Sequence, residues 1–335
     1  MRGNQGFSPR IPVPLLNNIH IINNTKTFNK QEGVRVCEAK NLGLALHTLV
    51  DHFVCVRVNV YLVYIMKTCI LFGNCHCSGV RKFLELSTFY DEYQIYQFAN
   101  WELIKDENHM AIPVHLIKNA DLVIYQPLSD VHNCYSTNRQ NPDSFFSLLR
   151  DDCKTISFPR IHNNAIFPIF HKTAYKSAFY GRIMNNIESL HHLAYLYENN
   201  MIDYDFDARM AENYYKSKEK EAECDIKIAD FIYNNISTHK LFLTQDHPTS
   251  FVFNELTSKI CAHLDLEYDY EKGAAAEENI VGLKDSIYGR ADDQYPISNY
   301  AINHFGFRYV QNESADANVF YGMNSVDYFV RSQNT

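Results

Sequence analysis

The chain has 335 residues, of which 46% are hydrophobic and 21% are charged, and its formal net charge is −8. This composition excludes a wholly disordered chain and provides enough apolar residues for one large domain or two small ones. The negative net charge argues against a general nucleic-acid-binding protein, because such proteins rely on clustered Lys and Arg side chains.

Cysteine usage and hydropathy indicate the environment of the protein. Nine cysteines are scattered through the chain, and the sequence shows no signal peptide with a basic start and a small-residue cleavage site. We therefore expect a reducing, cytoplasmic location. The most apolar window, 53–72, contains Arg57, Asn59 and Lys67. Such interruptions make stable membrane insertion an unfavourable interpretation.

The first 65 residues differ from the rest of the chain. Pro9, Pro12, Pro14 and many asparagines interrupt any periodic pattern before Leu42. We expect a loosely structured N-terminal extension, followed by an α/β domain that begins near Met66.

A short apolar run, 68–72, is bounded by Gly73 and reads as a buried parallel strand. Downstream, Val80, Phe83 and Leu84 recur at helical spacing. The order is therefore strand, tight turn, helix. Such a turn lies at the carboxyl end of the strand, where open α/β sheets bind ligands. The turn consists of five residues: Gly73, Asn74, Cys75, His76 and Cys77.

Cys75 is a candidate nucleophile, because a helix dipole favours the thiolate of a cysteine at the helix N-terminus. The alternative is that Cys75 and Cys77 are small buried side chains that fill a tight turn. A metal site is the least favoured interpretation, since adjacent residues such as Cys75, His76 and Cys77 cannot easily all face one ion.

Further strands are expected at 93–98, 121–125 and 154–158, with a helical stretch at 143–150. Residues 171–236, including 187–197 and 208–235, have a helical pattern that reads as an insertion or cap. The alternation predicts an α/β fold with a mostly parallel sheet flanked by helices.

A second strand-turn-helix unit follows. Residues 240–244 form the expected strand, and Val252, Leu256 and Ile260 predict a helix that begins just after Pro248, with Pro248 in its first turn. His247 would then lie at a strand's carboxyl end, on the same rim of the sheet as the cysteine turn.

Cys75 and His247 together supply a nucleophile and a general base for acyl chemistry. Asp246 could orient His247 or cap the following helix, and the capping role is slightly favoured. Candidate oxyanion donors are Asn74, the backbone N–H groups after Cys75, and Gln126 at the end of the third expected strand.

Five motifs occur in order: 73–76 (GNCH), 120–126 (ADLVIYQ), 156–159 (ISFP), 225–232 (DIKIADFI) and 247–249 (HPT). Together they resemble the WcbI-type polysaccharide biosynthesis family over about 66–328, which leaves residues 1–65 unmatched. The resemblance implies an SGNH/flavodoxin-like layout and a coenzyme A-binding acetyltransferase that decorates capsular or other surface glycans.

The resemblance also implies site residues. The Gly-Asn-Cys turn corresponds to Gly73, Asn74 and Cys75, and the second turn to 247–249. The family usually has Gln where this chain has His76, so His76 could act as a second base, and it often has Asn at the position of Asp246. The cofactor site is expected to include Ser78 and Gln126 as well. Coenzyme A carries phosphates, so a basic rim is expected among the available cations Arg81, Lys82, Arg160, Lys172 and Lys176.

The leading hypothesis is an acetyl-CoA-dependent O-acyltransferase that acts on a sugar hydroxyl of a surface glycan or its precursor, with His247 as general base. Two alternatives remain open: a thiol-dependent glycan esterase that uses the same residues, and a non-catalytic glycan-binding protein. None of the three requires a metal ion.

Overall fold

The structure is a computed structural model with two compact units, Met1–Ile65 and Met66–Thr335. It describes residues 34–37, 62–106, 109–167, 192, 195–196, 199, 201, 203–280, 297 and 299–309. In the first unit, strand β1 (Val34–Cys37) pairs antiparallel with β2 (Leu62–Ile65). The predicted loose structure of the remaining N-terminal residues lies outside the described part of the chain.

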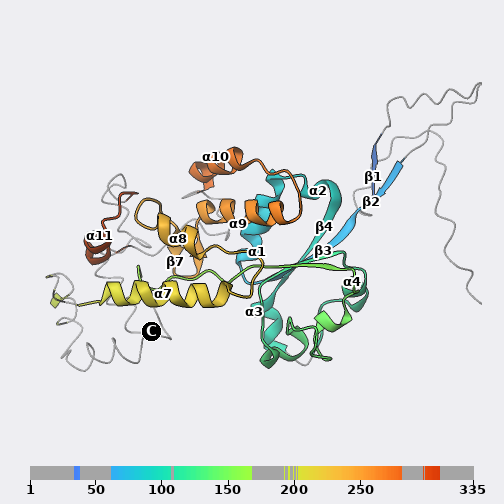
Figure 1. The fold of residues 1–335 in the computed structure, drawn as a ribbon, viewed down its shortest axis with the longest axis horizontal. Coiled ribbons are helices and arrows are strands. Elements are labelled where there is room, and N and C mark those ends of the chain that lie inside the picture. The colour runs from blue at the N-terminus through green and yellow to red at the C-terminus, as the bar shows by residue number, and fades with distance from the viewer. Residues whose placement is uncertain are drawn as a thin grey trace, which may run out of the picture. The chain divides into compact units, whose positions relative to one another are not determined.

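The second unit is built on a four-stranded parallel sheet with the order β4-β3-β5-β6 (Figure 1). Its strands are β3 (Lys67–Gly73), β4 (Tyr93–Ala99), β5 (Leu122–Tyr125) and β6 (Lys154–Ser157). The predicted α/β class and the four predicted strands are thereby confirmed, with ends that shift by one residue at most.

Alternate side chains of the central strands enter two hydrophobic clusters, because successive residues of a strand point to opposite faces. Leu71 and Ile124 belong to the cluster that includes side chains of α1 (His76–Phe83) and α9 (Ser250–His263). Ile70 and Val123 belong to the cluster on the other face. Burial on both faces explains why these strands are continuously apolar.

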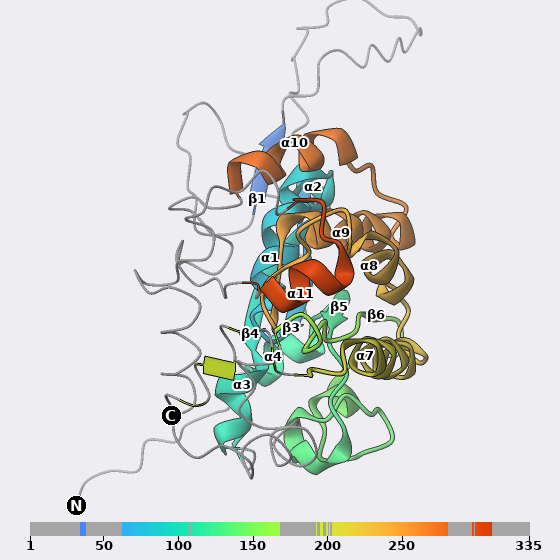
Figure 2. The ribbon, with the colours of Figure 1, turned by 90° about the vertical axis from the view of Figure 1, so that its left-hand side faces the viewer.

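The second cluster is covered by α4 (Val114–Lys118) and the 3₁₀ helix η4 (Phe145–Leu148). The prediction of a helix over 143–150 is therefore confirmed only as this shorter 3₁₀ turn. Figures 1 and 2 show α1 and α9 on one side of the strands and α3 (Asn100–Leu103) on the other.

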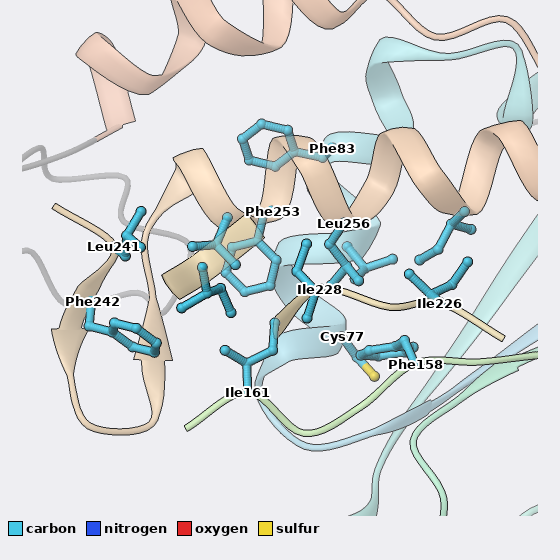
Figure 3. Close-up of a cluster of buried hydrophobic side chains, with 14 of the residues drawn as sticks. Cys77, Phe83, Phe158, Ile161, Ile226, Ile228, Leu241, Phe242, Phe253 and Leu256 are labelled. Carbon is cyan, nitrogen blue, oxygen red and sulfur yellow. The ribbon is translucent and has the colours of Figure 1, made fainter. Parts of the chain in front are cut away.

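The first cluster joins distant parts of the chain. Figure 3 shows Cys77 of α1 beside Phe158, which follows β6, together with Phe253 and Leu256 of α9. Ile226, which precedes α8 (Ala229–Asn235), packs in the same cluster. The apolar residues whose spacing predicts α1 and α9 are therefore the ones that pack together in this cluster.

The described part of the predicted helical region 171–236 includes the helices α7 (Phe206–Glu221) and α8 (Ala229–Asn235). They confirm part of the predicted helical region, but residues 222–228 interrupt the expected continuous helix 208–235. The segment before α8 is bound to the end of β6, where Ile226 N–H donates to the Ser157 carbonyl at 3.0 Å. Most of the predicted helix 187–197 lies outside the described residues.

The strand expected at 240–244 is shorter and differently paired. β7 (Phe242–Thr244) pairs antiparallel with β8 (His247–Pro248), and in the described part of the chain neither strand joins the parallel sheet. Pro248 therefore lies in a strand, and its predicted place in the first turn of a helix is wrong. The helix α9 itself begins at Ser250, as its four-residue apolar spacing predicts.

The remaining described elements are shorter connections and C-terminal helices. They are η1 (Leu84–Leu86), α2 (Phe89–Glu92), η2 (Ile104–Asp106), η3 (Asp130–Tyr135), α10 (Tyr270–Ile280) and α11 (Asn299–Phe305). Among the described helices, none is both long enough and apolar enough to span a membrane.

Candidate functional site

The cysteine turn joins β3 to α1 at the carboxyl edge of the sheet. The Asn74 side-chain oxygen accepts the His76 backbone N–H at 2.9 Å, and the Asn74 carbonyl accepts the Cys77 N–H at 3.1 Å. Cys75 is the N-cap residue of α1 and is half-buried, whereas Cys77 is fully buried in the core. Of the two thiols, only Cys75 reaches the surface of the turn.

Gln126 supports this turn from the neighbouring strand. Its side-chain oxygen accepts the Asn74 backbone N–H at 2.8 Å, and the residue is 3% exposed. A Cβ atom at Gly73 would lie 2.8 Å from both the Gln126 oxygen and the Cys77 sulfur. Glycine is therefore required at position 73 for its small size, because β3 and the Gln126 side chain approach each other so closely.

His76 is fully buried, and both of its ring nitrogens are engaged. Its Nε2–H donates to the Asp246 backbone carbonyl at 2.7 Å, and its Nδ1 accepts a hydrogen bond from the Gln126 amide at 3.1 Å. Burial lowers the pKa of His76 from 6.5 to about 4, although the bond to Asp246 opposes this shift. A neutral imidazole that is hydrogen-bonded at both ring nitrogens is suited to holding the two turns together. It is not suited to the role of a second base, which the sequence suggests.

The second predicted turn, between β7 and β8, meets the first one. The His76–Asp246 hydrogen bond joins the residue after Cys75 to the residue before His247. The Asn163 N–H also donates to the Gln245 carbonyl at 2.9 Å, which ties this turn to the chain after β6. The half-buried His247 lies close enough to His76 to lower its pKa slightly. Cys75 and His247 thus flank a single hydrogen bond.

The Asp246 carboxylate is held by the side chains of a histidine and an arginine. His162 Nδ1 lies 2.7 Å from its Oδ1 atom, and Arg160 Nη2 donates to the same oxygen at 2.8 Å. Burial would raise the pKa of Asp246, but these two partners together hold it well below its usual range. The N-cap of α9 is Thr249. The favoured capping role of Asp246 is therefore wrong, because His247 and Pro248 lie between it and the N-cap residue.

Most of the predicted oxyanion donors already make hydrogen bonds within the protein. The backbone N–H groups of His76, Cys77 and Ser78 all donate within the turn, to Asn74 or Cys75 oxygens. The Gln126 amide nitrogen donates to His76. The Asn74 side-chain oxygen accepts a hydrogen bond within the turn, and the role of its amide nitrogen as an oxyanion donor stays a prediction.

The predicted basic rim divides into near and distant residues. Arg160 bonds Asp246 at the site, whereas Arg81 and Lys82 lie in the last turn of α1, about 9 Å or more along the helix from Cys75. Ser78 accepts a hydrogen bond from Gln97 of β4 at 3.1 Å. Lys172 and Lys176 lie outside the described residues.

Two residues of the site are missed by the sequence reasoning. His162 bonds Asp246, and Lys220 of α7 lies near Arg160. Desolvation of the ammonium group and the nearby cations Arg160 and Lys216 lower the pKa of Lys220. His162 lies only three residues after the 156–159 motif, and this proximity could have indicated it as a site residue. No local signal in the sequence connects Lys220 to Arg160, which lies 60 positions earlier in the chain.

Two of the comparisons with known proteins found a match. A family model described as polysaccharide biosynthesis enzyme WcbI matches residues 68–269, which is more than half of the chain. No curated protein matches. A solved structure of WcbI, described as a novel polysaccharide biosynthesis enzyme in its native form without a disulfide bond between coenzyme A and a cysteine, has 16% sequence identity and a TM-score of 0.46. That match covers 80% of this chain and 99% of the other. By the family-model match, the chain belongs to the WcbI family of polysaccharide biosynthesis enzymes.

Proposed function

We propose that this enzyme transfers an acyl group from acetyl-coenzyme A to a sugar hydroxyl of a surface glycan or its precursor. The observation that supports this most directly is the hydrogen bond between His76 and the Asp246 carbonyl, which is flanked by Cys75 and His247. A thiol and an imidazole in neighbouring turns at the carboxyl edge of a parallel sheet are suited to acyl chemistry.

The chain offers a fitting environment for the coenzyme. Arg160 is 58% exposed at its side chain and uses one nitrogen for Asp246, so its other donors can bind a phosphate. Lys220 adds a second cation near Arg160. When bound, acetyl-coenzyme A would supply the acyl group as a thioester. Arg160 and Lys220 would hold its phosphates beside the cysteine turn.

His247 would act as the general base, removing the proton either from the Cys75 thiol or from the sugar hydroxyl. In the covalent route Cys75 would accept the acyl group while His247 passes the Cys75 proton to the departing coenzyme thiolate. His247 would then take the proton of the sugar hydroxyl and return it to the Cys75 thiolate as the acyl group moves to the sugar oxygen. In the direct route Cys75 would only contact the acyl donor, and the deprotonated sugar hydroxyl would attack the carbonyl carbon of the thioester. In both routes the proton held by His247 ends on the departing thiolate. Asn74 would donate to the carbonyl oxygen, which becomes negatively charged in the transition state.

The role of Asp246 would be to hold the turn rather than to bond His247. Its carboxylate is occupied by Arg160 and His162, and its carbonyl by His76. Through these bonds it would fix the position of His247 relative to Cys75, which is a positioning role.

Calorimetric titration of the full chain with coenzyme A tests this proposal, because both routes require the donor to bind. Saturable binding is expected in the native protein and in Cys75→Ala. Absence of binding would contradict the proposal. Release of acetate from an acetylated glycan without coenzyme A would favour a thiol-dependent esterase.

Incubation with acetyl-coenzyme A followed by peptide mass spectrometry separates the two routes. An acetyl group on the Cys75 peptide that is lost on addition of acceptor sugar supports the covalent route. Transfer that proceeds undiminished in both Cys75→Ser and Cys75→Ala would remove Cys75 from the chemistry. His247→Ala should abolish turnover and leave coenzyme A binding in place.

A further inference from the structure

Trp101 lies at the same edge of the sheet as the cysteine turn. Ala99, the last residue of β4, pairs with Gly73, the last residue of β3. Trp101 is two residues beyond Ala99, as Cys75 is two residues beyond Gly73. Because neighbouring strands lie about 4.8 Å apart, the two segments begin next to each other at this edge of the sheet, and α1 and α3 then lie on opposite sides of the strands. The helix that carries Trp101, α3, contacts both β3 and β4.

The indole of Trp101 is exposed although its helix is well anchored. Leu103 and Ile104 pack against the second hydrophobic cluster, and Asn100 is 8% exposed. Trp101 itself is 48% exposed and is the single tryptophan of the chain. The Lys105 ammonium lies 4.9 Å from the centroid of its ring. The segment is therefore held by its neighbours, while a large, rigid aromatic surface faces outward.

The two sides of the cysteine turn differ in chemistry. On the β5–β6 side lie the charged groups Arg160 and Asp246, joined at 2.8 Å. On the β4 side lies the indole, and residues 100–106 carry one lysine and two carboxylates, Glu102 and Asp106. A phosphate-bearing ligand is favoured on the first side and disfavoured on the second, where negative charge predominates. A neutral ligand with an apolar face fits the second side.

We propose that Trp101 is a platform for a pyranose ring of the acceptor glycan. One face of such a ring presents C–H groups, which pack on the electron-rich face of an indole and bury apolar surface from both. Lys105 can donate hydrogen bonds to hydroxyl groups at the rim of the ring. The acceptor role of the bound sugar rests on the proposed acyl transfer. In that arrangement the sugar approaches Cys75 from β4, and the coenzyme approaches from β6.

Intrinsic fluorescence tests the platform directly, because the chain has one tryptophan. The full-length protein, excited where tyrosine does not absorb, is titrated with methyl α-mannopyranoside, methyl β-galactopyranoside and N-acetylglucosamine, with glycerol as a polyol control. A saturable change of emission with at least one sugar, absent with glycerol, is expected. If no sugar changes the emission, or if glycerol changes it equally, the platform is overturned. A change with coenzyme A alone would assign the ring to the coenzyme and overturn it as well.

Variants separate this proposal from the acyl transfer itself. Trp101→Ala should weaken binding of the responding sugar about tenfold in calorimetry, and Trp101→Phe should retain part of the affinity. Tyr96→Ala removes a different exposed aromatic side chain, in the middle of β4, and should leave sugar affinity unchanged. Coenzyme A binding should be equal in all four proteins. Sugar affinity that is unchanged in Trp101→Ala contradicts the platform, whereas a native protein that binds sugar but not coenzyme A contradicts only the proposed acyl transfer.

Discussion

His76 links the two turns of the candidate site through an imidazole that burial keeps neutral. Its folded-state pKa is about 4, below the ordinary value of 6.5. The unfolded chain therefore binds a proton between these values that the folded chain does not, and stability must depend on pH in this window.

We predict that this contribution to stability is complete above pH 6.5 and is lost as the pH falls toward 4. The shift corresponds to a loss of up to about 3 kcal/mol in the free energy of unfolding. Denaturant unfolding at a series of pH values measures it. His76→Gln keeps an amide that can donate to the Asp246 carbonyl but does not titrate, so its stability should vary less across the window. Identical profiles for the two proteins would contradict the assignment.

Gly73 gives a second prediction for a single residue. In Gly73→Ala the new methyl group meets the Gln126 oxygen and the Cys77 sulfur at 2.8 Å, so a buried, hydrogen-bonded side chain has to shift. We expect the free energy of unfolding to fall by about 2 kcal/mol. Chemical denaturation measures the change. Ser78→Ala in the first turns of α1 loses one half-buried hydrogen bond, to Gln97, and serves as a control that should cost about 1 kcal/mol or less.

At the level of elements, the start of α8 depends on a carboxylate from the end of α7. The Glu221 Oε2 atom accepts the backbone N–H groups of Ile228 and Ala229 at 2.7 and 2.8 Å, and the residue is 1% exposed. The N-cap residue Ile228 makes no side-chain cap of its own. Glu221 therefore does the work of an N-cap from seven residues away.

Glu221→Ala should lower the free energy of unfolding by about 2 kcal/mol, because two buried N–H groups lose their acceptor. Glu212→Ala, in the same helix, removes an exposed pair with Lys216 at 2.5 Å and should cost less than about 0.5 kcal/mol. Thermal or chemical denaturation compares them. Equal losses of unfolding free energy in the two variants would show that the hydrogen bonds of Glu221 contribute no more than an exposed ion pair.

The pairing of β7 shows that an apolar run does not by itself place a strand in the parallel sheet. Its apolar run and the following helix match the first strand-turn-helix unit, yet β7 pairs with β8 through Phe242 and Pro248. Periodicity describes which side chains are buried and not which backbone they pair with. The apolar run therefore does not tell whether β7 joins the parallel sheet or pairs with the adjacent β8.

For the whole molecule, both hydrophobic clusters and the entire parallel sheet lie within Met66–Thr335. We predict that a fragment beginning at Met66 unfolds in one cooperative transition with the midpoint of the full chain, since it retains the complete core. Denaturant titration of both proteins measures this, and calorimetry should give equal coenzyme A affinities. A broad, non-cooperative transition of the fragment would show that the first 65 residues contribute to the fold.

The sequence by itself determined the strand-turn-helix unit at Cys75, the four strands of the parallel sheet and the family resemblance. These follow from local signals: an apolar run bounded by glycine, helical spacing, and motifs in order. Trp101 is visible in the sequence as a residue, but its place at the same edge of the sheet as the cysteine turn depends on the register of β4 against β3.

Only the tertiary structure decided how the turns meet. The hydrogen bonds between His76 and Asp246, between Asn74 and Gln126, and between His162 and Asp246 join residues that are 170, 52 and 84 positions apart. Local sequence patterns hold no information on such pairs, because their geometry comes from strand order and from the path of the chain after β6. The pKa of His76 likewise arises from burial that the whole fold creates, and so the structural role of that imidazole became visible only in three dimensions.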